Sequence, residues 1–214
     1  MKPNQKLIDM WTRAASEYHM ELAGSPAEEY LKQRGLLDYA EKFLLGYVAE
    51  PAPGHEDRFI NTLSIPYRTA SGVVAFKFRK LDDSSPKYTS PTGQKHHLYN
   101  VQAIIDAVEQ VLVVEGELDA IAATSAGLPA VAVAGVNAWK PHFARCFDGI
   151  GRVIVVTDND LKEDGSNPGQ DLARRLVDTL PNAVRVSLPM GEDINSTLLS
   201  HGAQYLAELV GSIE

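Results

Sequence analysis

The segment VLVVEGELDAIAATSAG, residues 111–127, joins four apolar residues directly to a carboxylate, a glycine and two further acids. Further along, VIVVTDND, residues 153–160, repeats the pattern of an apolar run that ends in acids. Short β-branched runs of this kind indicate strands buried on both faces, as in parallel sheets covered by helices. The arrangement of these strands therefore determines both the fold and the role of the acidic residues that follow them.

Strands and helices alternate throughout the region that contains these two segments. We predict strands and helices in turn at 111–114, 117–126, 130–134, 138–147, 152–157, 168–180, 183–188 and 194–209. Asn167 stands where it can cap the helix that begins at 168. This alternation, with solidly apolar strands, predicts an α/β domain with a central parallel sheet flanked by helices.

The earlier part of the chain predicts a smaller α+β subdomain. Ser25 and Glu28 form a capping box at the start of a short helix, and Gly35 ends it. The runs at 59–69 and 72–80 read as two strands around a turn.

A boundary between the two parts is expected near residues 100–108. Asn100 is expected to cap a helix that runs to about Glu109. The predicted organisation is an N-terminal subdomain at 1–105 and an α/β domain at 106–214.

Composition is that of an ordinary globular chain: 214 residues, 44% hydrophobic and 22% charged. No apolar run approaches the length of a membrane span, and a single cysteine, Cys146, excludes a disulfide framework and a cysteine-based zinc ribbon. A reducing cytoplasm is the expected location. The net charge of −8 is uneven, because residues 58–100 carry seven basic and two acidic residues, so their +5 leaves −13 for the remainder. A basic segment beside an acidic one suits a site that binds phosphates and metal ions, although a solvated hairpin would show the same charge.

The acids come after strands whose carboxyl ends should share one edge of the sheet. Glu115 follows the first strand, Asp158 and Asp160 follow the third, and Asp193 comes just after the fourth. Asp119 lies one helical turn from Glu115 and can point the same way. Ligands bind at this edge in open parallel sheets, and clustered carboxylates repel unless a cation lies between them. Oxygen ligands without cysteine or histidine favour magnesium or manganese, and hence phosphoryl transfer or phosphodiester hydrolysis.

Each acidic motif taken alone has a simpler interpretation. Glu115 could be a helix cap or a partner of the helix dipole, and Asp158-Asn159-Asp160 could be an Asx turn. The chain has no Gly-x-Gly-x-x-Gly and no phosphate-loop motif. Acids at three strand ends together favour metal binding.

An ordered string of motifs resembles a known arrangement. VVEGELDAI, AGVNA, VIVVTDND with GQDLARRL, and LPMGEDIN resemble the Toprim domain of DnaG-type primases, topoisomerases, recombination mediators and some nucleases. Before them YLKQRGL, FLLGYVAE, LSIPYR, GVVAFKFRKL, PKYTSP and LYNVQAI resemble the N-terminal half of the bacterial primase RNA-polymerase core. The resemblance covers roughly residues 27 to 210 and implies a Toprim domain preceded by a primase-core-like subdomain that faces nucleic acid.

The resemblance also implies roles for the acids. Glu115, Asp158 and Asp160 match the catalytic positions, and the metal-binding positions are matched by Glu115, Asp119, Asp158, Asp160 and Asp193. Asn195 stands where DnaG-type proteins have a second aspartate, and this Asp-x-Asn pattern is similar to that of phage primase-helicases. It puts a full DnaG-like metal set in doubt and favours a phage or mobile-element protein.

In the basic half, the positions linked to nucleic-acid or nucleotide binding are matched by Arg34, Arg79, Lys87 and, more loosely, Lys95. The resemblance implies a primase that synthesises short RNA primers on single-stranded DNA from ribonucleoside triphosphates with Mg²⁺ or Mn²⁺. A replicative helicase and a separate zinc-binding module are the expected partners. The alternatives are a Toprim nuclease, which shares the metal site, and a noncatalytic DNA-binding subunit of the replisome.

Overall fold

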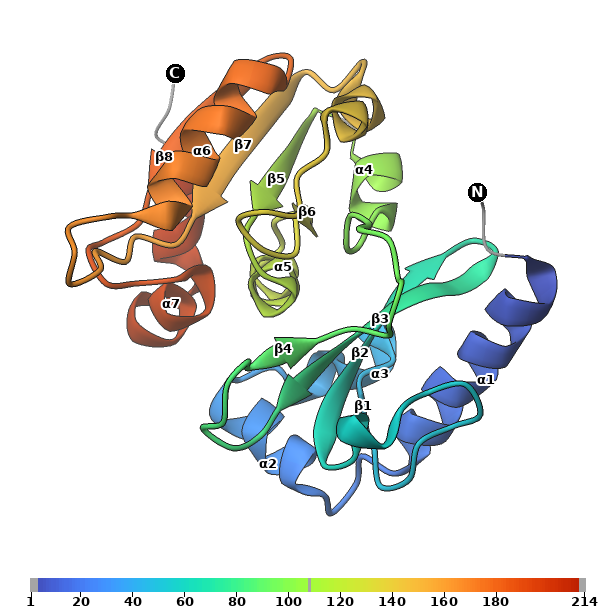
Figure 1. Ribbon diagram of the computed structural model, residues 1–214. Helices are drawn as coiled ribbons and strands as arrows, with labels where there is room; N and C mark the ends of the chain where they lie inside the picture. The colour runs from blue at the N-terminus through green and yellow to red at the C-terminus, as the bar shows by residue number, and fades with distance from the viewer. Residues whose placement is uncertain (1–3, 108, 212–214) are drawn as a thin grey trace. The chain divides into compact units, whose positions relative to one another are not determined.

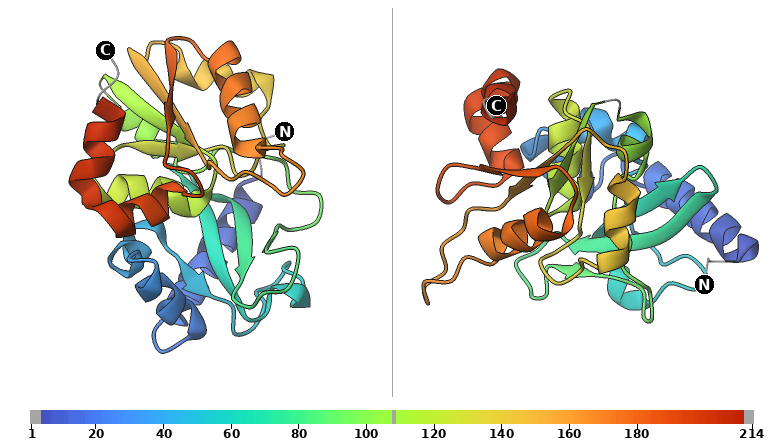
Figure 2. Two further views of the ribbon diagram at one scale, coloured as in Figure 1. Left: turned by 90° about the vertical axis from the view of Figure 1, so that its left-hand side faces the viewer. Right: turned by 90° about the horizontal axis from the view of Figure 1, so that it is seen from above.

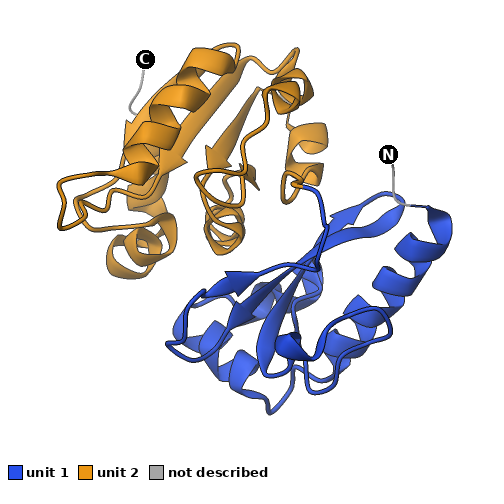
Figure 3. Ribbon diagram, in the orientation of Figure 1, with its two compact units in different colours: residues 1–95 blue, residues 96–214 orange. Residues whose placement is uncertain are grey.

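A computed structural model describes residues 4–107 and 109–211 of the chain. The chain divides into two compact units, residues 1–95 and 96–214, coloured separately in Figure 3. The boundary predicted between residues 105 and 106 falls at the end of helix α4 (Gln102–Asp106), inside the second unit. None of the helices in the described ranges is long and apolar enough to cross a membrane.

The first unit is an α+β structure, in line with the predicted subdomain (Figure 1). Its elements are α1 (Gln5–Met20), α2 (Pro26–Gln33), η1 (Leu37–Tyr39), α3 (Ala40–Phe43), β1 (Gly46–Tyr47), η2 (Asp57–Phe59), β2 (Thr62–Thr69), β3 (Gly72–Lys80) and β4 (Tyr88–Thr89). The strands form one antiparallel sheet in the order β1-β2-β3-β4.

Local signals explain these elements. The Ser25 side chain accepts a hydrogen bond from the Glu28 backbone N–H, which confirms the predicted cap of α2. One face of α1 buries Ala14, Ala15 and Tyr18 in a cluster with phenylalanines of β3 and η2. The core of this unit thus comes from an amphipathic helix laid on the sheet.

The second unit is the predicted α/β domain. After α4 its elements are β5 (Gln110–Val114), α5 (Glu117–Ser125), β6 (Ala130–Ala132), η3 (Pro141–Phe147), β7 (Arg152–Thr157), α6 (Pro168–Thr179), β8 (Ala183–Ser187) and α7 (Ile194–Gly211). The four strands are parallel and ordered β6-β5-β7-β8. The strand predictions from the apolar runs are confirmed.

Helices cover both faces of this sheet, which is why the strands are apolar throughout. Figures 1 and 2 show α6 and η3 on one face and α5 and α7 on the other. Alternate residues of β5 and β7, such as Val113 and Val155, pack with Leu172 and Leu176 of α6. The intervening residues, among them Ile154, are fully buried towards the opposite face.

The segment before α4 closes one edge of the sheet. Tyr99 forms an antiparallel bridge with Ala132 of β6, and its N–H donates to the Ala132 carbonyl at 2.9 Å. The Ala132 N–H donates back to the Tyr99 carbonyl at 3.1 Å, and Leu98 is buried beside it. This connection is therefore part of the second unit's fold.

Two local predictions were wrong. Asn100 has a positive φ of 58° and donates through Nδ2 to the Ala130 carbonyl, so it fixes the chain before α4 and its side chain does not cap the helix. The helix ends at Asp106, and residue 108, which the predicted helix included, lies outside the described residues. The helix expected at 138–147 is the 3-10 segment η3, which starts at Pro141.

Candidate functional site

The carboxyl ends of β5, β7 and β8 are neighbours at one edge of the parallel sheet. The register pairs Val114 with Val156 and Val156 with Val186, so the residues after these strands emerge side by side. Glu115 directly follows β5 and Asp158 directly follows β7. The prediction that these acids share an edge is confirmed.

Glu115 and Asp158 lie in an electrostatically unfavourable environment. Burial, followed by the charges of Asp158 and Asp160, raises the pKa of Glu115 to about 7, and the cation of Lys162 partly opposes this. Burial, followed by the charges of Asp193 and Asp160, raises the pKa of Asp158 to about 6. Acids from three strand ends therefore interact, as the topology requires.

One carboxylate oxygen of Glu115, Oε2, is buried without a hydrogen-bond partner in the described part of the chain. A buried carboxylate oxygen without a partner is costly, and a cation would offset that cost. This orphaned atom is the clearest structural sign that the edge accepts a positively charged ligand.

Gly169, in the first turn of α6, allows the two acids to approach that helix. A Cβ at this position would lie 2.3 Å from the Asp158 carbonyl oxygen and 3.2 Å from Glu115 Oε2. Only a residue without a side chain fits there. Gly169 was absent from the predicted site, although a glycine directly after Pro168 at a helix start was a usable signal.

Asp119 connects the amino-terminal turns of two helices. Its Oδ1 accepts a hydrogen bond from the Asn195 N–H at 3.4 Å. Its Oδ2 would lie 2.6 Å from a Cβ placed on Gly116, so the carboxylate folds back over the start of α5. The predicted placement one turn after Glu115 thus puts Asp119 next to the start of α7.

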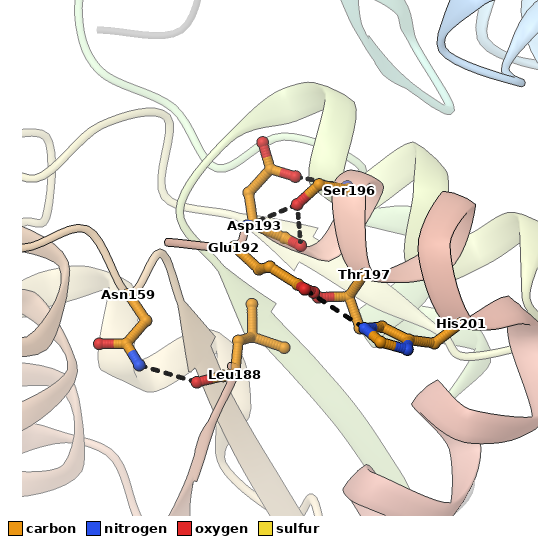
Figure 4. A network of polar contacts seen from close by, with 7 residues as sticks. All are labelled: Asn159, Leu188, Glu192, Asp193, Ser196, Thr197 and His201. Carbon is orange, nitrogen blue, oxygen red and sulfur yellow. Dashed lines mark hydrogen bonds and ion pairs between the residues drawn. The ribbon is translucent and has the colours of Figure 1, made fainter. Parts of the chain in front are cut away.

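Asp193 caps α7, as Figure 4 shows. Its carboxylate accepts from the Ser196 N–H at 2.6 Å, and its own N–H donates to Ser196 Oγ at 3.0 Å. This reciprocal arrangement anchors the loop after β8 and leaves the charge of Asp193 within range of Asp158. Asp160 pairs instead with Lys162, whose Nζ is 3.7 Å away in a half-exposed ion pair.

The donor set fits a hard divalent cation. Within residues 4–107 and 109–211, no three histidine, cysteine, aspartate or glutamate side chains lie close enough together to enclose a metal ion. The acids line an edge, so they would supply some ligands and leave others to water or to substrate phosphates, as Mg²⁺ sites commonly do. The exclusively oxygen chemistry and the unpartnered Glu115 Oε2 are consistent with such an ion.

The basic residues predicted to bind nucleic acid belong to the first unit. Arg79 of β3 places its guanidinium 4.1 Å from the ring centre of Tyr30, and Arg34 lies 5.4 Å from the same ring. Arg79 also lies 5.8 Å from the ring of Tyr88, its partner in the β3–β4 register. Arg34 and Arg79 are therefore brought together by α2, β3 and β4.

The two lysines are more exposed. Lys87 lies beside the Arg79 cluster, because its carbonyl accepts from the Lys80 N–H at 2.9 Å and its side chain is exposed. Lys95 lies on the exposed loop after β4, next to Gln94, which bonds to the Phe76 backbone near the middle of β3. The geometry groups Lys87 with the two arginines and leaves Lys95 on a different part of the unit.

Comparison with known proteins agrees with this architecture. Residues 110–204 match the family model described as Toprim domain, which places the second unit in that class. The chain is 39% identical to the Gene 57 protein of Mycobacterium phage D29 over 153 residues, covering 69% of this chain and 97% of that protein. The chain belongs to the primase-like Toprim family that contains this phage protein.

Longer relatives extend the likeness to the first unit. The DNA primase of Pasteurella multocida is 27% identical over 94% of this chain, which spans 42% of that primase. The RNA polymerase domain of Mycobacterium tuberculosis primase DnaG superposes with a TM-score of 0.77 at 25% identity, covering 99% of this chain and 84% of that domain. The same domain has also been solved in complex with double-stranded DNA. The two-unit architecture is thus that of a primase catalytic core.

Proposed function

We propose that this chain is a primase-type nucleotidyltransferase that synthesises short RNA primers on single-stranded DNA, dependent on Mg²⁺ or Mn²⁺. The observation that carries the proposal is the half-buried, mutually repelling pair Glu115 and Asp158, with the buried Glu115 Oε2 left unpartnered. A cation would relieve this repulsion, and the family relationship supports nucleotidyl transfer as the chemistry that uses it.

Each acid receives a role in this proposal. Asp158, Asp160 and Glu115 would hold the divalent ions, and Asp119 and Asp193 would complete the acidic edge. The bound ions would supply Lewis-acid activation of the 3′ hydroxyl and charge stabilisation at the α-phosphate. In the proposed reaction the 3′ oxygen bonds to the α-phosphorus, the bond to pyrophosphate breaks, and Glu115 would take the hydroxyl proton.

The basic residues receive the complementary role. Arg34, Arg79 and Lys87 would bind template or nucleotide phosphates, with Tyr88 available as a partly exposed ring beside them. Lys95, on the loop after β4, would make a separate phosphate contact. A relative solved with bound DNA supports a nucleic-acid substrate for this family.

A primer-synthesis assay tests the proposal directly. The full chain is incubated with end-labelled single-stranded DNA, labelled ribonucleoside triphosphates and Mg²⁺, alone and with a helicase or a zinc-binding module. New RNA that disappears with EDTA and in Asp158→Ala supports primase activity. Shortening of the labelled strand identifies a Toprim nuclease instead.

A noncatalytic replisome subunit gives a third pattern. DNA binding would then persist without synthesis or cleavage, and Asp158→Ala would leave function intact. A cytoplasmic location and a phage or mobile-element replication system are part of the proposal, and the similarity to the Gene 57 protein of Mycobacterium phage D29 supports the phage origin. The helicase arm of the assay tests that setting, since a replication protein of this kind is expected to respond to its helicase.

A further inference from the structure

Asn159, the residue between the two acids after β7, uses both its backbone and its side chain to hold neighbouring segments. Its N–H donates to the Glu192 carbonyl at 3.2 Å, and its carbonyl accepts from the Gly191 N–H at 2.9 Å. Its Nδ2 donates to the Leu188 carbonyl at 2.7 Å, as Figure 4 shows. Its Oδ1 accepts from Asn167 Nδ2 at 3.1 Å. We call these five residues the Asn159 latch.

The latch joins elements that carry different acids. Asn159 lies between Asp158 and Asp160, whereas Leu188, Gly191 and Glu192 form the loop that ends at Asp193. Asn167 is the N-cap of α6 and accepts from the Gln170 N–H at 3.2 Å. The latch therefore fixes the loop after β7 to the loop after β8 and to the start of α6.

The loop after β8 is also held from its other side. The Glu192 carboxylate accepts from Thr197 Oγ1 at 2.6 Å and lies 3.2 Å from His201 Nε2 (Figure 4). Asp193 and Ser196 exchange the capping hydrogen bonds described above. The loop is thus fastened between Asn159 and the first turns of α7, so a change at Asn159 releases only one of its two attachments.

The acids themselves do not hold this arrangement together. Asp158, Asp160 and Asp193 carry like charges, and their repulsion favours separation of the two loops when no cation is present. Hydrogen bonds from a neutral amide to backbone carbonyls oppose that separation without adding charge. Partners beyond the direct ligands commonly hold metal ligands in place in this way.

We propose that Asn159 is a positioning residue that holds Asp158 and Asp160 at a fixed distance from Asp193, ready for a divalent ion. This inference rests on the proposed metal-dependent function. It assigns Asn159 no contact with substrate or with the ion. Its effect is exerted through the backbone of the two loops.

Metal affinity of the full chain, measured by calorimetric titration with Mn²⁺ and Mg²⁺, tests this role. Asn159→Ala removes the side-chain half of the latch, and we expect affinity to fall about 10-fold or more. The matched control is Asn182→Ala, which removes a similar Nδ2 hydrogen bond, to the Ile150 carbonyl at 3.3 Å, before the start of β8. Its thermal stability should fall while its metal affinity stays near that of the wild type.

Asn159→Asp separates positioning from electrostatics. The carboxylate keeps the shape of the amide but cannot donate to the Leu188 carbonyl, and its added negative charge alone would strengthen attraction of a cation. The latch predicts weaker metal binding in spite of that charge. Hydrogen exchange of the metal-free protein should show faster exchange of the amides of residues 159 and 191 in both Asn159 variants and unchanged rates in Asn182→Ala.

The outcomes distinguish the two proposals. If the wild type binds metal and both Asn159 variants bind it as tightly, the positioning role is refuted and the proposed function stands. A wild type that binds neither ion refutes the proposed metal-dependent function, and the positioning role with it. If Asn159→Ala fails to fold, Asn159→Asp alone decides, with affinity equal to or above that of the wild type counting against the latch.

Discussion

Replacing Gly169 with alanine should destabilise the second unit even though alanine is the better helix former. Gly169 is buried in the first turn of α6. The added methyl carbon would sit 2.3 Å from the Asp158 carbonyl oxygen, where a normal contact needs well over 3 Å. Because that oxygen belongs to the backbone, either the loop after β7 or the start of α6 must move.

Two opposing effects determine how much Gly169→Ala changes the free energy of unfolding. Alanine gains up to about 1 kcal/mol over glycine inside a helix, and less in its first turn. Overpacking of a buried site costs about 1–3 kcal/mol, and the contact here is severe. We therefore expect a net loss of roughly 1–3 kcal/mol, which lowers Tm by several degrees in a chain of this size.

Urea denaturation and metal titration of the same preparation provide the measurement. Because the methyl carbon would also lie 3.2 Å from Glu115 Oε2, weaker Mn²⁺ binding should accompany the loss of stability. Gly211→Ala is the control, since a Cβ at that helical position meets nothing within 4 Å. A Gly169→Ala protein as stable as the wild type, with unchanged Mn²⁺ affinity, would refute the close-contact argument.

The charges lead to three further predictions. In EDTA, Asp158→Asn should be more stable than the wild type by about 2–3 kcal/mol at pH 8, and the advantage should vanish near pH 4. The raised pKa of Asp158, about 6, means that its favourable protonated state is lost as pH rises through that value; equal urea midpoints at pH 8 would contradict this. The first unit should show the opposite trend, because burial lowers the pKa of His55 to about 4 and its neutral ring is bound to the Tyr18 hydroxyl. The stability of the first unit that is present above pH 6.5 is therefore lost as pH falls from 6.5 through 4. The pKa shift of His55 corresponds to roughly 3 kcal/mol of unfolding free energy, and partial exposure of the ring reduces this to about 1–2 kcal/mol. In His55→Gln, the difference in unfolding free energy between pH 7 and pH 5, measured by denaturation, should be smaller than in the wild type. Finally, Arg79→Ala should weaken single-stranded DNA binding, measured by fluorescence anisotropy, and reduce the slope of log affinity against log salt by about 0.7. Replacing the exposed Arg13 of α1 with alanine should change neither the affinity nor the slope. Equal losses in the two variants would show that Arg79 contributes only nonspecific positive charge.

Much of the fold is encoded in local pattern. The apolar runs before Glu115 and Asp158, together with the alternation of strands and helices, indicated a parallel sheet covered on both faces, and the parallel order places both acids at one edge. This is why residues separated by more than a third of the domain could be assigned to one site from the sequence alone.

The missed features depend on contacts that periodicity does not encode. Gly169 is required because the backbone carbonyl oxygen of Asp158, eleven residues earlier in the chain, leaves no room for a Cβ. Asn159 was taken only as part of a turn, yet its partners come from the loop after β8 and from the cap of α6. The helix prediction at 138–147 failed because helical periodicity does not distinguish an α-helix from a 3-10 segment in a short stretch that contains Pro141.

The bridge between Tyr99 and Ala132 has a consequence for dividing the chain into fragments. A fragment that begins at residue 96 keeps the segment that pairs with β6. A fragment that begins after residue 106 lacks Leu98, Tyr99 and α4, so the β6 edge of the sheet is exposed. An uncovered border recruits strands from other molecules. The shorter fragment is therefore expected to self-associate, and the longer one is the better choice for preparing the second unit in isolation.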